Sequence, residues 1–494
     1  MDQAAIDALG NLTVPAQRHI INGQTVAASD GQEMEVLSPL NGQRLTTVAK
    51  GTKADMDAAV AAARAAFEDR RWAGQTPAAR KNILLKWAEL IDTHALELAV
   101  LGVRDNGTEI SMALKAEPGS AAATIRYYAE AIDKHYGEIA PTQDGFLGLI
   151  HKEPVGVVGA IIPWNFPLMI GAWKLAPALA MGNSVVLKPA ETASLSLMRL
   201  VELAHEAGLP PGVLNAVTGE GPVVGEAMAL SMDVDVLVFT GSGGTGRRLL
   251  TYAAQSNLKR VYLELGGKSP NIVFADAPDL QEAAKVAAFG IFRNAGQVCV
   301  AGSRLLVETA IHDDFVSEVA RVAEAMKVGN PLDLSTAIGA VNSETQLRQN
   351  LQFVTTAVEE GGTIATGGGQ LLQETGGYFM APTIITDVAP KATLAQQEVF
   401  GPVLAVTPFR DEADAIRLAN DSIYGLAGGV WTANLSRAHR MIGAVRTGVI
   451  HVNTYGGPDV TVPLGGVGQS GNGHDKSLHA LEKYTNLKTA WIKL

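Results

Sequence analysis

The stretch "VGVVGAIIPWNFPLMIGAW", residues 155–173, sets the pattern of the fold. Its first half is rich in β-branched residues, Pro163 and Pro167 bracket Asn165 at its middle, and no side chain in it is charged. Its length would suit a membrane span. The two prolines and the change in composition instead predict a buried strand, a turn and a buried helix.

The same alternation continues along the chain. Short β-rich runs such as "NSVVLKP" (183–189), "GVLNAVTG" (212–219) and "VDVLVFTGS" (234–242) alternate with helical runs such as "SLMRLVELAHEAGL" (196–209), which predicts a parallel, doubly wound sheet. A second alternating set runs from about residue 269 to 470 and predicts another α/β domain. No linker rich in Pro, Ser or charge separates the two sets, so we expect them to pack closely around a cleft.

The two ends of the chain have different patterns. Asn-Gly pairs in "HIINGQTV" (19–26) and "SPLNGQRL" (38–45) predict antiparallel hairpins. Apolar residues at three and four spacing predict helices over 56–68, 79–101 and 121–137. The tail "YTNLKTAWIKL" (484–494) predicts a terminal strand, and we expect another subunit to cover its Trp491, Ile492 and Leu494.

Composition narrows the class of protein. With 494 residues, 47% of them hydrophobic and 18% charged, the chain can fold into two or three domains. The net charge of −11 comes without a basic cluster, which argues against a nucleic-acid or membrane partner. The single cysteine excludes an intrachain disulfide, and acids stand where a signal peptide needs bases. We therefore expect a cytoplasmic protein.

A glycine-rich run raises the possibility of a dinucleotide site. "GSGGTG" (241–246) matches G-x-G-x-x-G between a predicted strand and a predicted helix, and Glu264 lies where that motif places its ribose-binding acid. A glycine turn in which Ser242 caps the helix explains the motif equally well. Both interpretations stay open on the motif alone.

Two further motifs place charged residues at strand ends. In "LKPAET" (187–192), Lys188 ends a strand and we expect a helix to start at Pro189, with Glu191 in its first turn. In "LELGGKSPN" (263–271), Glu264 ends a strand before paired glycines, and Tyr262 breaks the P-loop spacing. The ten histidines and one cysteine form no zinc-like cluster, so we expect no metal site.

The only cysteine, Cys299, lies in "GQVCVAG" (296–302). A lone cysteine is more often a small buried hydrophobic residue than a nucleophile. Here, however, a strand-borne carboxylate, Glu264, and the Pro-bracketed Asn165 complete a possible nucleophile, base and oxyanion donor.

These residues resemble the aldehyde dehydrogenase superfamily, and the resemblance covers essentially the whole chain. Eight motifs come in the family's order: "PWNFP", "LKPAE", "FTGS", "LELGGKSPNIVFADA", "NAGQVCVAGSR", "QEVFGPV", "YGLAGGVWT" and "SGNGHDKS". The resemblance implies an α/β fold with a Rossmann-type cofactor-binding domain (1–131 and 155–266), an α/β catalytic domain (267–470) and a small β extension (132–154 and 480–494). That extension implies a homodimer or homotetramer.

The resemblance also assigns catalytic roles. Cys299 would be the nucleophile, Glu264 the general base rather than a ribose ligand, and Asn165 with the Cys299 backbone N–H the oxyanion hole. Lys174 and Asp475 match positions that relay protons from the base.

The implied cofactor is NAD, with NADP less favoured because Glu191 would repel a 2′-phosphate. The residues expected to bind it are Ile161, Trp164, Lys188, Glu191, Gly221, Gly225, Phe239, Gly241, Ser242, Leu265, Glu398 and Phe400. The residues expected to line the aldehyde channel are Phe166, Met169, Ile170, Trp173, Val298, Val300, Tyr455, Asp459 and Leu464, with core packing as the alternative for the aliphatic ones. Asp459 could hold a substrate amino group.

The implied reaction oxidises an aldehyde to a carboxylic acid through a cysteine thiohemiacetal and a thioester. The final motifs are closest to a bacterial subgroup acting on amino, glutamylamino and indole-type aldehydes, so we expect an ω-amino, aryl or medium-chain aldehyde. A coenzyme-A-acylating semialdehyde dehydrogenase and a non-catalytic relative are the alternatives. His474 and Leu464 depart from the family's usual Arg and Phe, which affects the expected subunit contacts and the pocket mouth.

Overall fold

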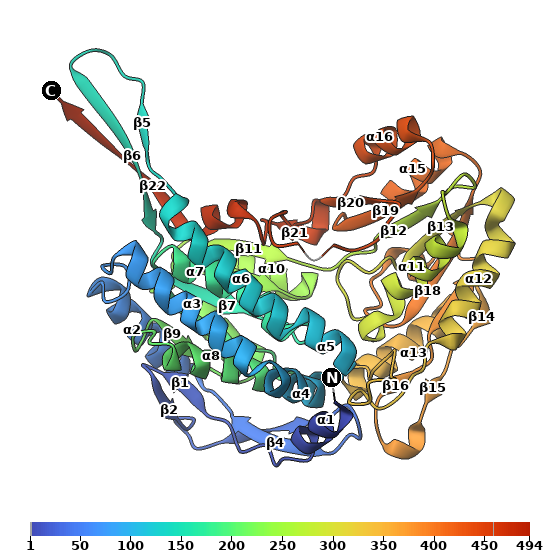
Figure 1. The fold of residues 1–494 in the computed structure, drawn as a ribbon, viewed down its shortest axis with the longest axis horizontal. Coiled ribbons are helices and arrows are strands. Elements are labelled where there is room, and N and C mark those ends of the chain that lie inside the picture. Colours follow the sequence, from blue (N-terminus) through green and yellow to red (C-terminus); the bar gives the residue numbers. More distant parts are fainter. Residues whose placement is uncertain (1, 458) are drawn as a thin grey trace.

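A computed structural model describes residues 2–457 and 459–494, which form two α/β lobes and a projecting β arm (Figure 1). Within these residues the first sheet has eight strands, in the spatial order β2 (Gln24–Val26), β1 (His19–Ile21), β9 (Leu214–Ala216), β8 (Ser184–Lys188), β7 (Val157–Ile161), β10 (Val236–Thr240), β11 (Arg260–Glu264) and β21 (Gly471–Asn472). The five strands from β9 to β11 are parallel, and β1, β2 and β21 run antiparallel at the edges.

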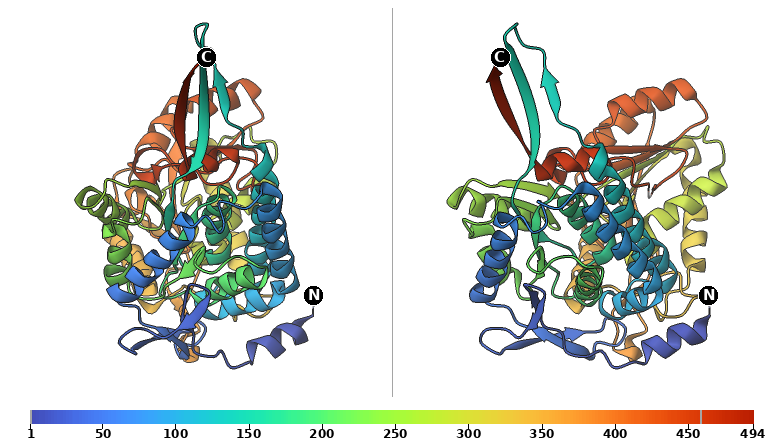
Figure 2. Two further views of the ribbon diagram at one scale, coloured as in Figure 1. Left: turned by 90° about the vertical axis from the view of Figure 1, so that its left-hand side faces the viewer. Right: turned by 60° about the vertical axis from the view of Figure 1, so that its left-hand side comes forward.

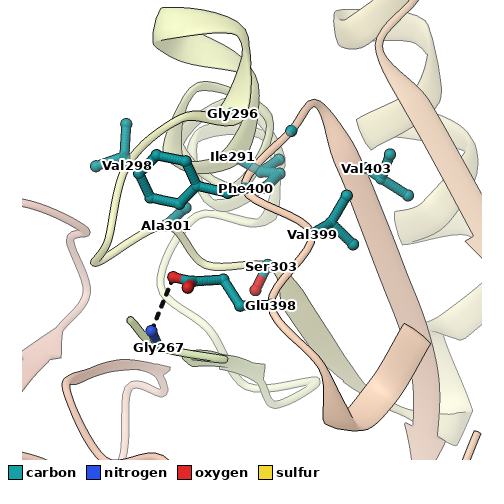
Figure 3. A pocket seen from close by; sticks show the side chains of 11 residues that line it. Gly267, Ile291, Gly296, Val298, Ala301, Ser303, Glu398, Val399, Phe400 and Val403 are labelled. Atoms are coloured by element: carbon teal, nitrogen blue, oxygen red, sulfur yellow. Dashed lines mark hydrogen bonds between the residues drawn. The ribbon is translucent and has the colours of Figure 1, made fainter. Parts of the chain in front are cut away.

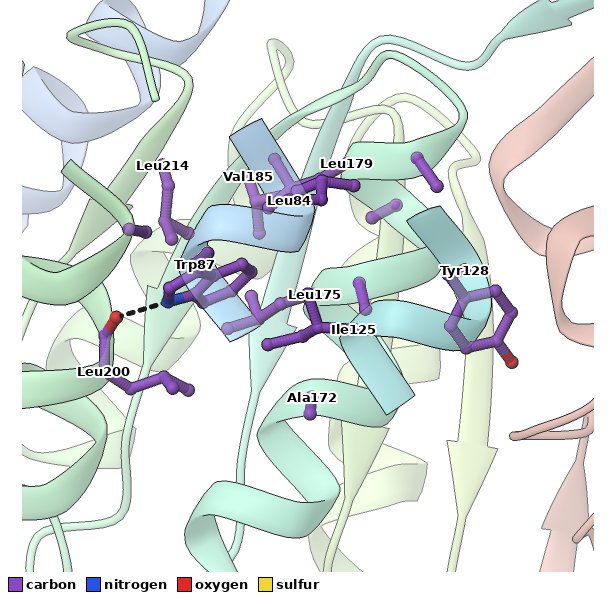
Figure 4. Close-up of a cluster of buried hydrophobic side chains, with 14 of the residues drawn as sticks. Leu84, Trp87, Ile125, Tyr128, Ala172, Leu175, Leu179, Val185, Leu200 and Leu214 are labelled. Atoms are coloured by element: carbon purple, nitrogen blue, oxygen red, sulfur yellow. Dashed lines mark hydrogen bonds between the residues drawn. The ribbon is translucent and has the colours of Figure 1, made fainter. Parts of the chain in front are cut away.

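Helices cover both faces of the first sheet. One face carries α3 (Pro77–Thr93), α6 (Pro118–Ala131), α7 (Pro167–Ala180) and α8 (Leu195–Glu206), and the other carries α2 (Lys53–Glu68), α9 (Glu226–Leu230) and α10 (Gly243–Gln255). Trp87 fills the first of these layers among apolar side chains, and its indole N–H donates to the Leu200 carbonyl at 3.0 Å (Figure 4). The predicted doubly wound arrangement is confirmed.

The second sheet is parallel apart from one edge strand. Its order is β14 (Thr363–Thr366), β17 (Thr383–Thr386), β18 (Val403–Phe409), β13 (Arg304–Glu308), β12 (Pro270–Val273), β19 (Ala427–Trp431) and β20 (Val449–Val452). α11 (Leu280–Phe292), α12 (His312–Ala325) and α13 (Glu344–Glu359) cover one face, and α15 (Glu412–Asn420) and α16 (Leu435–Ala444) cover the other. The chain passes from the first sheet to the second between Glu264 and Pro270.

The arm is a three-stranded antiparallel sheet that extends away from both lobes (Figure 2). Its order is β22 (Thr485–Lys493), β6 (Phe146–Pro154) and β5 (Glu138–Ala140), so the predicted terminal strand is confirmed. Leu487, Trp491 and Leu494 are mostly exposed on this single chain. The predicted domain boundaries fall close to the changes of sheet, and we keep them as a proposal.

The stretch 155–173 folds as expected. β7 runs to Ile161, a turn contains Asn165, and α7 begins at Pro167. Both Asn-Gly pairs lie in turns between antiparallel strands, the second of them between β3 (Glu33–Leu37) and β4 (Arg44–Ala49). In the described part of the chain, no helix combines the length and apolar content that a membrane crossing requires.

Three predicted helix limits were wrong. The helix expected over 121–137 is α6, which ends at Ala131, followed by a short 3₁₀ turn that ends at Lys134. The helix expected to start at Pro189 begins at Leu195, because Ala190 and Ala193 form a tight bridged turn and the buried Asp105 carboxylate accepts the Leu195 N–H at 2.9 Å. The helix expected over 79–101 divides at His94 into α3 and α4 (Ala95–Asn106). The start at Leu195 depends on a partner distant in sequence, which local periodicity does not reveal.

Candidate active site

The candidate site lies where the strand order of the first sheet reverses. The chain winds outward from β7 through β8 to β9, then returns to the other side of β7 for β10 and β11. Ligands of open α/β sheets bind beyond the carboxyl ends of the strands at such a point. The Asn165 turn follows β7, Ser242 follows β10 and Glu264 ends β11, so three predicted site residues share this edge.

The cysteine loop comes from the second lobe and meets this edge. Cys299 lies between α11 and β13, and it is the only cysteine of the chain. Gly296, at φ +73°, packs so closely on Gly401 that a Cβ would lie 2.1 Å from its carbonyl oxygen. A Cβ on Gly266 would lie 1.9 Å from a Glu398 carboxylate oxygen. These glycines therefore allow the segment at 398–401 to pack against the loop.

Hydrogen bonds join Asn165 to the cysteine loop. Its side-chain amide donates to the Gln297 carbonyl at 2.9 Å, and its own carbonyl accepts from the Asn294 amide at 3.2 Å. Asn165 is buried. One amide N–H is thus held by the loop, and the second is the group that could donate to an oxyanion.

Asn294 supports this arrangement, and the sequence-based predictions gave it no role. Asn294 and Ala295 both have left-handed backbone angles, with φ of +50° and +49°. The Asn294 backbone N–H donates to the buried Glu109 carboxylate at 3.1 Å, and the Thr108 hydroxyl donates to its side-chain oxygen at 2.7 Å. The motif "NAGQVC" was visible, but nothing in the sequence indicated that residues 108 and 109 would support it.

Glu264 lies in a buried cluster of charges. The Asp475 carboxylate accepts from Lys174 at 2.5 Å and from Lys483 at 2.5 Å, and all three side chains are almost fully buried. Burial raises the pKa of Glu264 well above its usual value, Asp475 raises it further, and the two lysines lower it. The predicted pair Lys174 and Asp475 does come together, and Lys483 is an additional member that sequence reasoning missed.

The thiol environment disfavours a thiolate in the resting structure. Cys299 keeps some access to solvent, but surrounding protein atoms, Glu398 and Glu264 together raise the pKa of the thiol to about 12. A neighbouring base must therefore take the proton for the thiol to act as a nucleophile. The two candidates are the carboxylates that act on the thiol, Glu398 and Glu264, and one oxygen of Glu264 has no hydrogen-bond partner among the described residues.

A small pocket beside Cys299 is lined by the segment from Glu398 to Gly401 and by the cysteine loop (Figure 3). The Glu398 carboxylate accepts the Gly267 N–H at 2.9 Å. Phe400 has a left-handed φ of +56°, and its ring meets Trp164 edge-on at 5.2 Å. Burial raises the pKa of Glu398 to about 7.

Comparison with known proteins identifies the family of this chain. The model of the aldehyde dehydrogenase family matches residues 26–490. The chain belongs to the aldehyde dehydrogenase family. The predicted fold class and the predicted activity are confirmed: it is an NAD(P)-dependent aldehyde dehydrogenase.

Several relatives of this aldehyde dehydrogenase are about half identical to it. The NADP/NAD-dependent aldehyde dehydrogenase PuuC of Escherichia coli is 50% identical over 97% of this chain and 96% of its own length. The indole-3-acetaldehyde dehydrogenase AldA of P. syringae, solved as a variant with NAD+ and IAA, is 49% identical at a TM-score of 0.98. The gamma-glutamyl-gamma-aminobutyraldehyde dehydrogenase of Burkholderia cenocepacia is 47% identical, also at 0.98. Each of these two alignments covers 100% of this chain and 100% of the other chain.

The dehydrogenase has a surface suited to a dinucleotide at the carboxyl edge of its first sheet. Glu191 is half-buried, accepts the Gly221 N–H at 2.6 Å and lies 3.3 Å from the Lys188 ammonium. The first turn of α10 is open, since a Cβ on Gly244 would meet no atom within 4 Å, and Ser242 caps it. Free N–H groups at a helix start bind phosphate. These residues could hold both the ribose and the phosphates of the cofactor.

The remaining predicted cofactor residues lie along the same edge or beside it. Ile161 pairs with Lys188 on one side and with Phe239 on the other, which aligns three neighbouring strand ends. Gly241 follows Phe239 directly, and Leu265 follows Glu264. Gly225 ends the single helical turn that Gly221 begins.

The predicted substrate residues have different surroundings. Ile170 and Phe166 are buried in the core of the second lobe, and Val298 is also buried there. Met169, Trp173 and Val300 are partly exposed at the edge of that core. For the fully buried Ile170, packing is the better explanation of its position.

Three further substrate candidates lie on or near the C-terminal segment. The Tyr455 hydroxyl donates to the Val300 carbonyl at 2.8 Å and so supports the cysteine loop. Leu464 exchanges both backbone hydrogen bonds with Asp475, at 2.8 and 2.7 Å. Asp459 is exposed and accepts two hydrogen bonds from Thr461. Within 2–457 and 459–494, no group of three or more His, Cys, Asp or Glu side chains could hold a metal ion.

Proposed function

We propose that this aldehyde dehydrogenase oxidises ω-amino, aryl or medium-chain aldehydes to carboxylic acids in two half-reactions on Cys299. The observation that carries the proposal is the meeting of three groups from different elements: the Cys299 loop, the Asn165 amide bonded to that loop, and the buried Glu264 carboxylate. A nicotinamide dinucleotide, when bound, would supply the hydride acceptor. The protein supplies the nucleophile, the oxyanion donors and the base.

In the first half-reaction the Cys299 thiol gives its proton to a neighbouring carboxylate, Glu398 or Glu264, which releases it to solvent, and the sulfur bonds to the aldehyde carbon. The carbonyl oxygen becomes an oxyanion, which the free Asn165 N–H and the Cys299 backbone N–H stabilise. As the carbonyl re-forms, the hydrogen on that carbon leaves with its electron pair. The substrate carbon is thereby oxidised to a thioester.

In the second half-reaction a water attacks the thioester carbon. Glu264 takes a proton from this water, the new C–O bond forms, and the C–S bond breaks to release Cys299 as a thiolate. We infer that Lys174 and Asp475 pass the proton away from Glu264; their mutual hydrogen bond and the effect of both charges on Glu264 support this role. A coenzyme-A-acylating enzyme would use a thiol in place of water. The retained Glu264 argues for water.

The substrate class is inferred from the relatives and from Asp459, which the sequence predicts among the channel residues. A γ-glutamylaminobutyraldehyde and an indole-3-acetaldehyde dehydrogenase are about equally similar to this chain. Asp459 is the acid that we propose for holding a substrate ammonium group. The test is a panel of aliphatic, ω-amino and aromatic aldehydes, comparing kcat/KM from NADH absorbance. If Asp459→Ala lowers kcat/KM equally for amino and uncharged aldehydes, Asp459 does not hold the ammonium group. If no aldehyde of the panel is oxidised, the chain would instead be a non-catalytic relative.

The enzyme's assembly and location are further parts of the proposal. The exposed apolar side chains of the arm favour a homodimer or homotetramer in which a partner covers them. The exposed His474 would lie near such contacts. A cytoplasmic location fits a reactive thiol, which persists in a reducing compartment.

A further inference from the structure

Asp475 binds two lysines inside the protein. Lys174 reaches its Oδ2 from helix α7, and Lys483 reaches its Oδ1 from η7 (Leu478–Tyr484), each at 2.5 Å. The exposed fractions of the three side chains are 1%, 4% and 1% for Lys174, Lys483 and Asp475. Buried charges are costly unless they are paired, so this triad is a fixed part of the site.

The triad carries one net positive charge, which balances the negative charge of an ionised Glu264. With Glu264 ionised, the cluster holds two carboxylates and two ammonium groups, so its net charge is zero. Lys174 alone could neutralise only one carboxylate. Without Lys483, an ionised Glu264 would leave an uncompensated negative charge where water cannot screen it.

Other titratable groups face the cluster, but they do not replace Lys483. Those facing Glu264 or Asp475 are Cys299, Tyr128, Tyr484 and Lys476. The Tyr128 hydroxyl donates to the Ser477 carbonyl. The Lys476 ammonium lies 5.7 Å from the centre of the Trp173 ring and makes no ion pair among the described residues.

The backbone holds Lys483 firmly in this position. The carbonyl of the next residue, Tyr484, accepts hydrogen bonds from the Asn183 amide at 3.0 Å and from the Val155 N–H at 3.2 Å. One residue later the chain enters β22 of the arm. Asp475 is fixed from its own side by the paired backbone bonds to Leu464.

We propose that Lys483 is a positioning residue for the general base: its ammonium neutralises Asp475, so that Lys174 can offset the charge of Glu264 during thioester hydrolysis. The inference rests on the proposed role of Glu264 as base. It gives Lys483 a part in the second half-reaction, although Lys483 need not touch the substrate.

The direction of the expected effect follows from the charges. Lys174 and Lys483 both lower the pKa of Glu264, against burial and Asp475, which raise it. Removing Lys483 therefore raises that pKa further, and a smaller fraction of Glu264 is ionised at neutral pH. Hydrolysis needs the ionised base, so the acid limb of the kcat–pH profile should move to higher pH.

The test compares three single variants by rapid mixing and steady-state turnover across pH. Lys483→Met keeps the length and loses the charge, Lys483→Arg keeps the charge, and Lys488→Met removes an exposed lysine of the same tail that pairs with Glu153. We expect Lys483→Met to keep the first NADH burst but to lose about tenfold in steady-state rate at neutral pH, with its acid limb about one unit higher. Lys483→Arg and Lys488→Met should keep the wild-type limb.

A double variant separates charge from packing. Asp475→Asn with Lys483→Met removes one charge of each sign, so its acid limb should return toward that of the wild type even if its rate is lower. It also provides the readout if Lys483→Met alone does not fold. Three results would each overturn the inference. The first two are an acid limb that is unchanged in Lys483→Met and an acid limb that is displaced equally in Lys483→Met and Lys483→Arg. The third is an acid limb of the double variant that does not return toward that of the wild type. Normal steady-state turnover of Glu264→Gln would instead overturn the proposed role of Glu264 itself.

Discussion

At the scale of single residues, the proposed chemistry depends on two side chains, Cys299 and Glu264, that hold their protons more tightly than usual. The thiol of Cys299 has its pKa raised to about 12, and the pKa of Glu264 is also raised. A thiol beside two carboxylates is inert until one of them accepts its proton. The two groups should therefore be separable by mutation, since attack needs the thiol and release of the acid needs the activated water.

Glu264→Gln keeps the shape of the side chain and removes the base. If the thiol proton can pass to a group other than Glu264, such as Glu398, we expect one NADH for each active subunit in a rapid-mixing experiment. Turnover should then stall at the thioester, because the proposed base for the attacking water is missing. Hydroxylamine should relieve the stall by attacking the acyl group. Loss of the first NADH as well would show that Glu264 also activates the thiol. Cys299→Ala is the control, because without the nucleophile it should form no NADH.

Glu191 sets the expected preference for NAD over NADP. Its carboxylate is half-exposed at the sheet edge, and it would accept from the ribose hydroxyls but repel a 2′-phosphate. Glu191→Ala should raise the NADP-to-NAD ratio of kcat/KM by about tenfold, the size expected for losing one charged hydrogen-bonding group. Glu220→Ala, an exposed acid next to Gly221 that pairs with Lys50, is the control and should leave that ratio unchanged.

At the scale of elements, the short helix η3 (Arg293–Gly296) fixes the cysteine loop in a strained form. Left-handed angles at two consecutive non-glycine residues cost energy that surrounding hydrogen bonds must offset. Thr108 and Glu109, from the segment after α4, provide two of those bonds. The burial of Glu109, which raises its pKa to about 7, shows how little water reaches this support.

Asn294→Ala tests this support. The variant removes the bonds to the Thr108 hydroxyl and the Asn165 carbonyl, so Asn165 and the thiol should lose their alignment. We expect kcat/KM and the rate of Cys299 alkylation to fall by roughly 10- to 100-fold, the equivalent of one or two buried hydrogen bonds. Asn257→Ala is the matched control, because Asn257 also donates to two backbone carbonyls, but on the far side of the first lobe. Equal losses in both variants would mean a general effect on stability.

At the scale of the whole molecule, the arm presents apolar side chains that this chain alone does not cover. Leu487 has 72% of its surface exposed, and both Trp491 and Leu494 are more than half exposed. A strand edge with such side chains is a typical site of subunit association. Strand β22 of the arm begins at the residue after Tyr484. The backbone bonds at Tyr484 therefore hold both the arm and Lys483 of the charge cluster.

Leu487→Asp should weaken the oligomer, because association would bury an unpaired charge. We expect sedimentation equilibrium to show a dimer or tetramer for the wild type and a shift toward monomer for the variant at micromolar concentration. Leu258→Asp changes an equally exposed leucine outside the arm and should assemble normally. A wild-type monomer would contradict the role given to the arm.

The sequence by itself determined the fold class and the alternation of strands and helices, and it pointed to the thiol, the carboxylate and the amide that we propose for catalysis. It could do so because period-two and period-3.6 patterns, prolines and glycines act locally, and because Cys299 is the only cysteine. Tertiary structure alone decided where α8 begins, since Asp105 caps it from another helix. It likewise decided that Glu109 would support the cysteine loop and that Lys483 would complete the charge cluster. A buried lysine and a surface lysine look alike in a sequence, and only long-range packing, which excludes water and brings Asp475 to it, distinguishes them.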